Sequence, residues 1–310
     1  MFRRRQLQRR EPVAASRDVL RQVRRIDLRT RGLVNSRFSG EYHSVFKGQG
    51  IEFAEVRQYL PGDDVRSIDW NVTARTGEPY LKRYIEEREL TVLLVVDLSG
   101  SQRWGSRGRF KSDLVVEVAA TLAMSAIRNN DRVGLLLVTS EVEWFVPPRK
   151  GRRHVLRLVR DLLAFQPEHR GTDLAAGLDY AVRLAPSRSI IFVFSDFRLG
   201  EGWDDFASTL TGATARHDVV AVHLTDPLDA ALPSVGLLAV RDPETGERMH
   251  LDTSSAAGRE TFTRAAVADA DRARRLFRRR QVDEIRLSTD APFNRELLSF
   301  FQRRERRLRR

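Results

Sequence analysis

The sequence contains no cysteine, which excludes disulfide bonds, thiolate zinc sites and a cysteine nucleophile. Its six histidines show no paired metal-ligand spacing, so histidine-based zinc hydrolases are also excluded. No apolar run approaches the roughly 20 residues that a membrane-spanning helix needs. The arginine-rich first residues lack the apolar centre of a secretory signal. These absences predict a cytoplasmic protein without a membrane span.

Positive charge is concentrated at the two ends of the chain. The net charge is +12, yet residues 1–37 hold +9 and residues 259–310 hold +8, which leaves −5 for the residues between them. This distribution differs from the uniformly basic surface of many nucleic-acid binders. The basic ends are open to three interpretations: solvated helix surfaces, a dock for an acidic protein, or contacts with nucleic acid or acidic lipid.

The stretch TVLLVVDLSGS at residues 91–101 combines a buried strand with a polar turn. Its apolar, mostly β-branched residues predict a strand buried on both faces of a parallel sheet. Asp97, Ser99 and Ser101 follow at alternate positions, where such a strand ends and where open α/β sheets bind ligands. Their oxygens suit Mg²⁺, Mn²⁺ or Ca²⁺. Taken alone, the same residues are as typical of a turn followed by a helix N-cap as they are of a metal site.

Two later segments supply further oxygen ligands. The apolar run SIIFVFSD ends at Asp196, a second carboxylate at the end of a strand, and Thr172 precedes a helical pattern at residues 174–185. With the first three residues, these reproduce the Asp-x-Ser-x-Ser … Thr … Asp pattern of a metal-ion-dependent adhesion site. The chain therefore resembles the von Willebrand factor type A fold.

The resemblance implies a set of roles for these five residues. Ser99, Ser101 and Thr172 are expected to touch a divalent ion. Asp97 and Asp196 are expected to act directly or through water, and one coordination position is left for a carboxylate of a partner protein. Mg²⁺ is the expected ion, with Mn²⁺ and Ca²⁺ as alternatives.

A second resemblance rests on the segment EFAEVRQYLPGDDVRSIDWNVTAR at residues 52–75. It is similar to a signature of the bacterial domain of unknown function 58 family, in which a variable front region precedes a von Willebrand A-like domain. The matching residues are Glu52, Phe53, Arg57, Tyr59, Pro61, Gly62, Asp63, Asp64, Arg66, Ile68, Asp69, Trp70, Ala74 and Arg75. Together the two resemblances cover about residues 36 to 300. They imply a MoxR-type AAA+ ATPase as partner, because its gene often lies beside those of relatives.

The signature segment also carries alternating charges. Its charged residues include Arg57, Asp63, Asp64, Arg66, Asp69 and Arg75. We interpret them as a network of ion pairs, because each acid has an arginine nearby and no nucleophile or histidine base accompanies them. A second metal or hydrolytic site is the alternative. Tyr59 and Trp70 are expected to be core anchors.

Alternating strand and helix patterns predict an α/β fold. We expect a doubly wound, mostly parallel sheet of von Willebrand factor A type. The short turn at residues 140–141 makes the strand at 143–146 an antiparallel edge strand. The expected organisation is a partly helical basic segment at 1–37, a small strand-rich front region at 38–88, the von Willebrand A-like domain at 89–300 and a basic tail at 301–310.

The predicted function is a metal-dependent protein-binding module and not an enzyme. By resemblance it acts as an adaptor or chaperone-like partner of a MoxR-type AAA+ ATPase. One alternative is a metal-dependent hydrolase, although hydroxyl ligands carry little charge and no general base is evident. The other is nucleic-acid binding through the basic ends, which predicts a steep salt dependence that survives metal removal.

Overall fold

The computed structural model describes residues 16–34, 38–46, 52–85, 89–103, 105–106, 108–186, 188–241 and 246–309. The chain divides into a small compact unit, Phe46–Leu90, and a large unit formed by the remaining residues. Residues 1–15 of the expected basic segment lie outside the described ranges. Within those ranges, no helix is both long enough and apolar enough to cross a membrane.

A six-stranded sheet forms the centre of the large unit, with the strand order β10-β7-β6-β3-β4-β5. Its strands are β3 (Thr91–Asp97), β4 (Arg132–Val138), β5 (Val142–Arg149), β6 (Ile190–Ser195), β7 (Asp218–Thr225) and β10 (Asp283–Ser288). Neighbouring strands are parallel, except that β5 pairs antiparallel with β4 at the edge. The predicted sheet, with its single antiparallel edge strand, is confirmed.

Strand β3 lies at the point where the chain changes direction in the sheet. It pairs with β4 on one side and β6 on the other, and all seven of its residues are buried. The chain builds outward from β3 to β4 and β5, and later outward from β6 to β7 and β10. In open α/β sheets this switch point is where ligands bind, outside the carboxyl ends of the strands.

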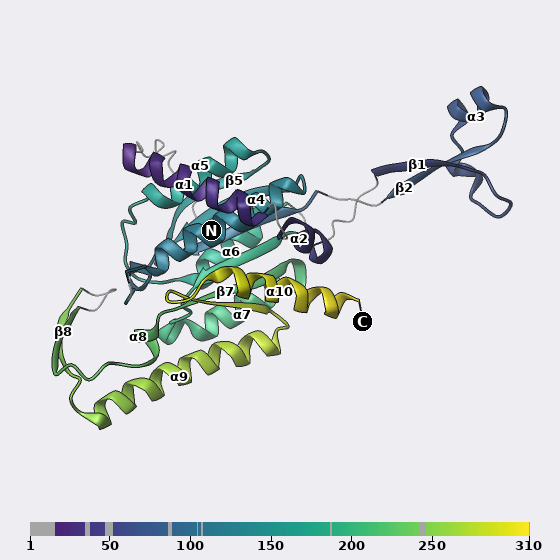
Figure 1. Ribbon diagram of the computed structural model, residues 1–310. Helices are drawn as coiled ribbons and strands as arrows, with labels where there is room; N and C mark the ends of the chain where they lie inside the picture. Colours follow the sequence, from purple (N-terminus) through teal and green to yellow (C-terminus); the bar gives the residue numbers. More distant parts are fainter. Residues whose placement is uncertain are drawn as a thin grey trace, which may run out of the picture. The chain divides into compact units, whose positions relative to one another are not determined.

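Helices cover both faces of the sheet (Figure 1). They are α1 (Arg17–Leu33), α2 (Ser39–Val45), α4 (Lys111–Arg128), α5 (Arg152–Ala164), α6 (Leu174–Leu184), α7 (Trp203–Arg216), α8 (Pro227–Ala230), α9 (Ala256–Arg279) and α10 (Phe293–Leu308). One core cluster joins Leu93 and Val95 of β3 to residues of α6, α7 and α9. Alternation along a strand turns successive side chains to opposite faces, so both faces of β3 require apolar cover.

Aromatic packing joins the two ends of the chain to the large unit. Phe38 and Tyr42, the latter in α2, make edge-to-face contacts with Phe301 of α10 at ring-centroid distances of 6.3 and 6.2 Å. All three side chains are almost completely buried. The small unit therefore begins at Phe46 and not at residue 38, and α10 continues through most of the segment expected to be a tail.

An antiparallel hairpin is appended to the large unit. It consists of β8 (Leu237–Arg241) and β9 (Arg248–Asp252). An Asp-Pro-Glu-Thr-Gly turn at residues 242–246, between two short strand-like runs, predicts this hairpin. Residues 242–245 lie outside the described ranges.

The small unit contains the antiparallel strands β1 (Glu52–Gln58) and β2 (Tyr80–Ile85), the 3₁₀ helix η2 (Val65–Ser67) and helix α3 (Trp70–Thr76). The predicted charge network is confirmed for one pair, in which Arg57 donates two hydrogen bonds to Asp63 at 2.8 and 2.6 Å. For Asp64 and Asp69 the described contacts are with backbone N–H groups, which their carboxylates accept as caps of η2 and α3. Trp70 is 69% exposed, so its assignment as a core anchor is wrong.

This geometry predicts different effects of substituting the three arginines of the signature segment. Arg57→Ala should lower the melting temperature of the small unit, because it removes a bidentate pair that fixes the turn after β1. Arg66→Ala and Arg75→Ala should leave it unchanged, since both side chains are exposed and form no ion pair with a described residue. Thermal melting with limited proteolysis at residues 46–90 distinguishes these results. Equal effects of all three substitutions would contradict the expectation.

Candidate metal centre

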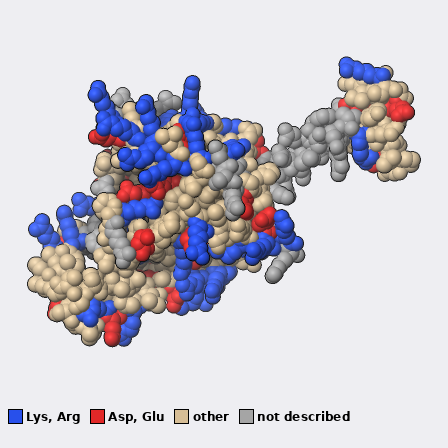
Figure 2. Space-filling view, viewed as in Figure 1, with Lys and Arg blue, Asp and Glu red and all other residues tan. Residues whose placement is uncertain are grey.

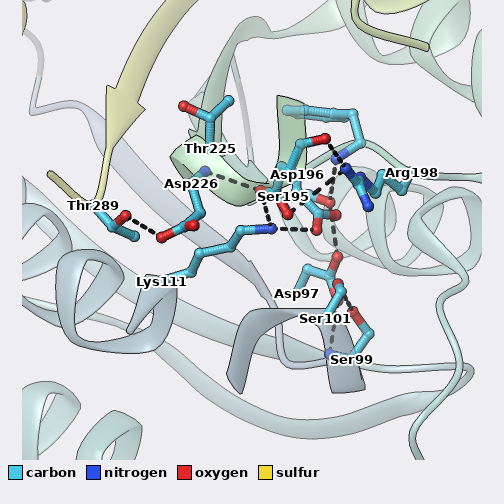
Figure 3. A network of polar contacts seen from close by, with 12 residues as sticks. Asp97, Ser99, Ser101, Lys111, Ser195, Asp196, Arg198, Thr225, Asp226 and Thr289 are labelled. Carbon is cyan, nitrogen blue, oxygen red and sulfur yellow. Dashed lines mark hydrogen bonds and ion pairs between the residues drawn. The ribbon is translucent and has the colours of Figure 1, made fainter. Parts of the chain in front are cut away.

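Three neighbouring parallel strands are each followed or ended by an aspartate at the same edge of the sheet (Figure 3). Asp97 is the last residue of β3, Asp196 follows β6 and Asp226 follows β7. Their exposed fractions are 1%, 7% and 2%. Buried carboxylates need hydrogen bonds or cations to remain charged, and the partners differ among the three.

The carboxylate of Asp97 is held by two hydrogen bonds. The backbone N–H of Ser99 donates to its Oδ1 at 2.8 Å, and the hydroxyl of Ser195 donates to its Oδ2 at 2.7 Å. The hydroxyls of Ser99 and Ser101 lie 3.1 Å apart in the same turn. Asp97 is therefore fixed in orientation beside two further oxygen ligands.

The charge of Asp97 is poorly compensated. Burial, and then the negative charge of Asp196, raises the pKa of Asp97 to about 6, although hydrogen bonds from Ser99 and Ser195 act in the opposite direction. In the described part of the chain, no lysine or arginine forms an ion pair with it. A cation beside Asp97 would favour its charged form.

Asp196 has a cation of its own. The ammonium of Lys111, the first residue of α4, lies 2.8 Å from Asp196 Oδ2 and 2.7 Å from Asp229 Oδ2. Lys111 is 1% exposed, and lysine is rarely buried so completely unless it is paired. Burial alone would raise the pKa of Asp196, but Lys111 outweighs it and the pKa lies below its ordinary value. A hydrogen bond with Ser101 acts in the same direction.

Asp226 serves to connect loops. Its carboxylate accepts hydrogen bonds from the backbone N–H groups of Ser106 and Leu228, both at 2.9 Å, and from the hydroxyl of Thr289. These bonds join the turn after β3 to the ends of β7 and β10. Asp226 therefore positions these three segments relative to one another.

Thr172 lies in the loop before α6, and backbone hydrogen bonds tie that loop to the site. The N–H of Gly100 donates to the carbonyl oxygen of Arg170 at 2.9 Å, and the N–H of Asp173 donates to that of Thr139 at 2.8 Å. Asp173 also caps α6. The loop that carries Thr172 is therefore held between the turn of Ser99 and Ser101 and the end of β4.

The five predicted residues would offer a metal ion two carboxylates and three hydroxyls. Such hard oxygen donors suit Mg²⁺, Mn²⁺ or Ca²⁺ and not the softer transition metals. The described residues contain no group of three or more His, Cys, Asp or Glu side chains able to hold a metal ion. An ion at this edge would therefore depend on the hydroxyl ligands and on water.

Sequence reasoning missed Lys111, Ser195, Arg198, Asp226 and Asp229. Arg198 donates to the carbonyl oxygen of Asp229 at 2.9 Å and thereby positions the partner of Lys111. Ser195 and Asp226 are visible in the sequence as polar residues at strand ends, whereas no local pattern marks Lys111, the first residue of α4.

A mostly parallel sheet covered by helices, with aspartates and serines at its carboxyl edge, is the fold class of von Willebrand factor type A-like proteins. The chain belongs to the family described as protein of unknown function DUF58, which matches residues 55–272. The family resemblance seen in the sequence is thereby confirmed.

Similarity to known proteins extends over most of the chain. The uncharacterized protein Rv1480 of Mycobacterium tuberculosis is 32% identical over 286 residues, which cover 92% of this chain and 89% of that protein. The solved structure of BatB from Bacteroides thetaiotaomicron is similar with a TM-score of 0.46 and 15% identity, covering 70% of this chain and 99% of that one. The SpRpn10 VWA domain is similar with a TM-score of 0.40 and 9% identity, covering 68% and 94%.

Proposed function

We propose that this chain is a metal-dependent protein-binding module and not an enzyme. A divalent ion, Mg²⁺ before Mn²⁺ or Ca²⁺, is held at the carboxyl edge by the hydroxyls of Ser99, Ser101 and Thr172, with Asp97 and Asp196 close by. The observation that carries the proposal is that two buried aspartates, Asp97 and Asp196, differ in whether a cation lies beside them. Asp196 is neutralised by Lys111, whereas buried Asp97 forms no ion pair with a described residue.

The unequal compensation favours binding of an additional anion. A divalent ion beside Asp97 retains one positive charge, because Lys111 and Arg198 together balance the charges of Asp196 and Asp229. That charge attracts an Asp or Glu side chain of a partner protein, which completes the coordination of the ion. Hydroxyl ligands leave the ion more strongly charged than carboxylates would.

The same contacts favour binding over hydrolysis. Both oxygens of Asp97 accept hydrogen bonds within the protein, and Asp196 Oδ2 accepts one from Lys111. A hydrolase needs a base that takes a proton from water, and these carboxylates are already used in positioning.

The proposed partner rests on the resemblance to the domain of unknown function 58 family. Genes of relatives often lie beside a gene for a MoxR-type AAA+ ATPase, so we propose such an ATPase as a partner and an adaptor or chaperone-like role for this chain. The sequence has no phosphate-binding loop of the Walker type. Any energy from ATP therefore comes from the partner.

Metal binding is tested directly by thermal unfolding. Adding Mg²⁺ or Mn²⁺ to the metal-free protein should raise its stability, because an ion that binds only the folded state stabilises it by about 2.7 kcal/mol at 100 times its dissociation constant. Differential scanning calorimetry with an ion titration measures the gain. A melting temperature that does not respond to either ion, with calorimetric titration showing no binding, would contradict the proposal.

Partner binding should depend on Thr172. Thr172→Ala removes a neutral ligand and leaves the net charge at +12, so long-range steering by the basic ends persists. We expect this variant, like the wild type in EDTA, to lose its partner, whereas moderate salt weakens the wild-type complex only slightly. Affinity capture with mass spectrometry measures the result, and Thr211→Ala on the exposed side of α7 is the matched control. A complex that survives Thr172→Ala and EDTA but dissolves in about 0.3 M salt would assign binding to the basic ends.

A further inference from the structure

An arginine-lined cavity forms between α9, β10 and α10. Its volume is about 310 Å³, near the lower limit of clefts that hold small molecules. The charged residues lining it are Arg274 and Arg278 of α9, Asp283, Glu284 and Arg286 of β10, and Arg303 of α10.

The two acidic residues of this cavity are already paired. Arg304 and Arg307, which do not line it, contact Asp283 at 2.8 and 2.6 Å. Glu284 is 2.8 Å from the ring of His223 and 2.7 Å from Arg286. Burial would raise the pKa of Glu284, but these two partners outweigh it and hold the pKa below its ordinary value. The acids therefore do not neutralise the remaining arginines.

Three arginines of the cavity are left with weak partners or none. Arg274 contacts Asp271 on the surface at 3.0 Å, with about two fifths of each side chain exposed, and such pairs contribute little. Arg303 donates to the neutral hydroxyl of Ser299. The guanidinium group of Arg278 makes no hydrogen bond or ion pair with any described residue.

A fourth arginine has an unused donor. Nη2 of Arg286 is buried and has no hydrogen-bond partner among the described residues. A buried guanidinium N–H without an acceptor is unfavourable, and an anion in the cavity would supply one once the Arg286 side chain turned toward it. Lys and Arg side chains also gather over the C-terminal helix (Figure 2), so the surrounding surface attracts anions.

We propose that this arginine cavity binds a phosphate-type oxyanion carried by a small molecule. The planar guanidinium group donates paired hydrogen bonds that match phosphate oxygens. The three arginines with weak partners or none supply more positive charge than a single carboxylate ligand would neutralise. This excess favours a dianion or a diphosphate as the ligand. The size of the cavity favours a small ligand over an extended chain. The proposal is independent of the metal centre.

Calorimetric titration of the full chain in phosphate-free buffer tests the proposal. The probes are inorganic phosphate, pyrophosphate, a nucleoside diphosphate and succinate. We expect saturable one-to-one binding of pyrophosphate and weaker binding of succinate. Tighter binding of the nucleoside diphosphate than of pyrophosphate identifies a phosphorylated organic molecule as the source, whereas the reverse order identifies free phosphates.

Two arginine substitutions distinguish binding in the cavity from attraction by the general positive charge of the surface. Arg278→Gln should weaken pyrophosphate binding about tenfold or more, the effect of losing a hydrogen bond between charged groups. Arg295→Gln changes net charge equally on an exposed part of α10 that does not line the cavity, and should alter binding less than about twofold. Circular dichroism checks that both variants fold.

Three results would overturn the proposal. One is the absence of saturable binding of every phosphate probe. Another is succinate binding as tightly as pyrophosphate, which would make this a carboxylate site for an acidic peptide. The third is an equal loss in both variants together with tight, salt-sensitive binding of a single-stranded oligonucleotide, which would assign the arginines to a nucleic-acid surface.

Discussion

Lys111→Met should lower the free energy of unfolding by about 3–5 kcal/mol, because it leaves a buried carboxylate without its cation. The ammonium contacts Asp196 at 2.8 Å and Asp229 at 2.7 Å, and the whole side chain is buried. Methionine is a flexible side chain of similar length, so the change removes the charge without leaving a large cavity. Chemical denaturation at neutral pH in EDTA measures the difference.

A second substitution distinguishes the lost charge from poor packing. Combining Lys111→Met with Asp196→Asn removes the uncompensated charge, and the double variant should recover part of the lost stability. Packing defects would instead leave the double variant at least as unstable as Lys111→Met alone. A loss below about 1 kcal/mol in the single variant would show that the ammonium is not the essential counter-charge of Asp196.

Adding a divalent ion provides a further readout for Lys111. If the ion binds near Asp97 and not in the place of the ammonium, Lys111→Met should still gain stability with Mg²⁺, because the hydroxyl ligands are unchanged. Loss of that response, with the fold intact, would place Lys111 among the groups that position the metal centre.

The sheet was predictable from sequence because its signals are local. Runs such as 91–97 and 190–195 are continuously apolar, as expected for strands buried on both faces, and the spacing of Leu114, Val118 and Leu122 marks the buried face of α4. Asp97, Ser99 and Ser101 were recognisable for the same reason, since they lie within five residues of one another at the end of a strand.

The remaining parts of the site depend on contacts that sequence patterns do not reveal. Lys111 meets Asp196 across 85 positions, and Ser195 meets Asp97 across 98. Only the parallel order of β3 and β6 brings these residues together. The packing of Phe38 on Phe301 is likewise a long-range contact, and it places both residues in the large unit.

Local charge patterns misled for a related reason. Asp64 and Asp69 have arginines nearby in sequence, but short helices begin at both positions and their free N–H groups compete for the carboxylates. A backbone N–H two residues away is closer than the end of a long, mobile arginine side chain. Capping therefore prevails over pairing at Asp64, and it uses one carboxylate oxygen of Asp69.

Asp97→Asn should stabilise the metal-free protein and abolish its response to metal. The wild-type carboxylate has a pKa of about 6 in the folded protein against an ordinary value of 3.8. This difference corresponds to a destabilisation of about 3 kcal/mol above pH 6. Asparagine removes the buried charge, but it satisfies the hydrogen bonds of Ser99 and Ser195 less well, so we expect a net gain of about 1–3 kcal/mol at pH 7.

The pH dependence of this gain follows from the direction of the pKa shift. Between pH 3.8 and 6 the folded wild type binds more protons at Asp97 than the unfolded chain, so its stability falls as the pH rises through this range. The advantage of Asp97→Asn should therefore be absent below about pH 4, grow up to about pH 6 and then stay constant. Denaturation curves of both proteins in EDTA across this range measure it.

Metal should reverse the order of the two proteins. With saturating Mg²⁺ the wild type gains stability from the ion that compensates Asp97, whereas Asp97→Asn gains none, because it has lost a negative charge beside the ion. Asp179→Asn on the exposed part of α6 removes one acidic charge elsewhere and should respond like the wild type. A variant at Asp97 that is less stable than the wild type in EDTA, yet still stabilised by Mg²⁺, would show that its carboxylate has a structural role and that the ion binds elsewhere.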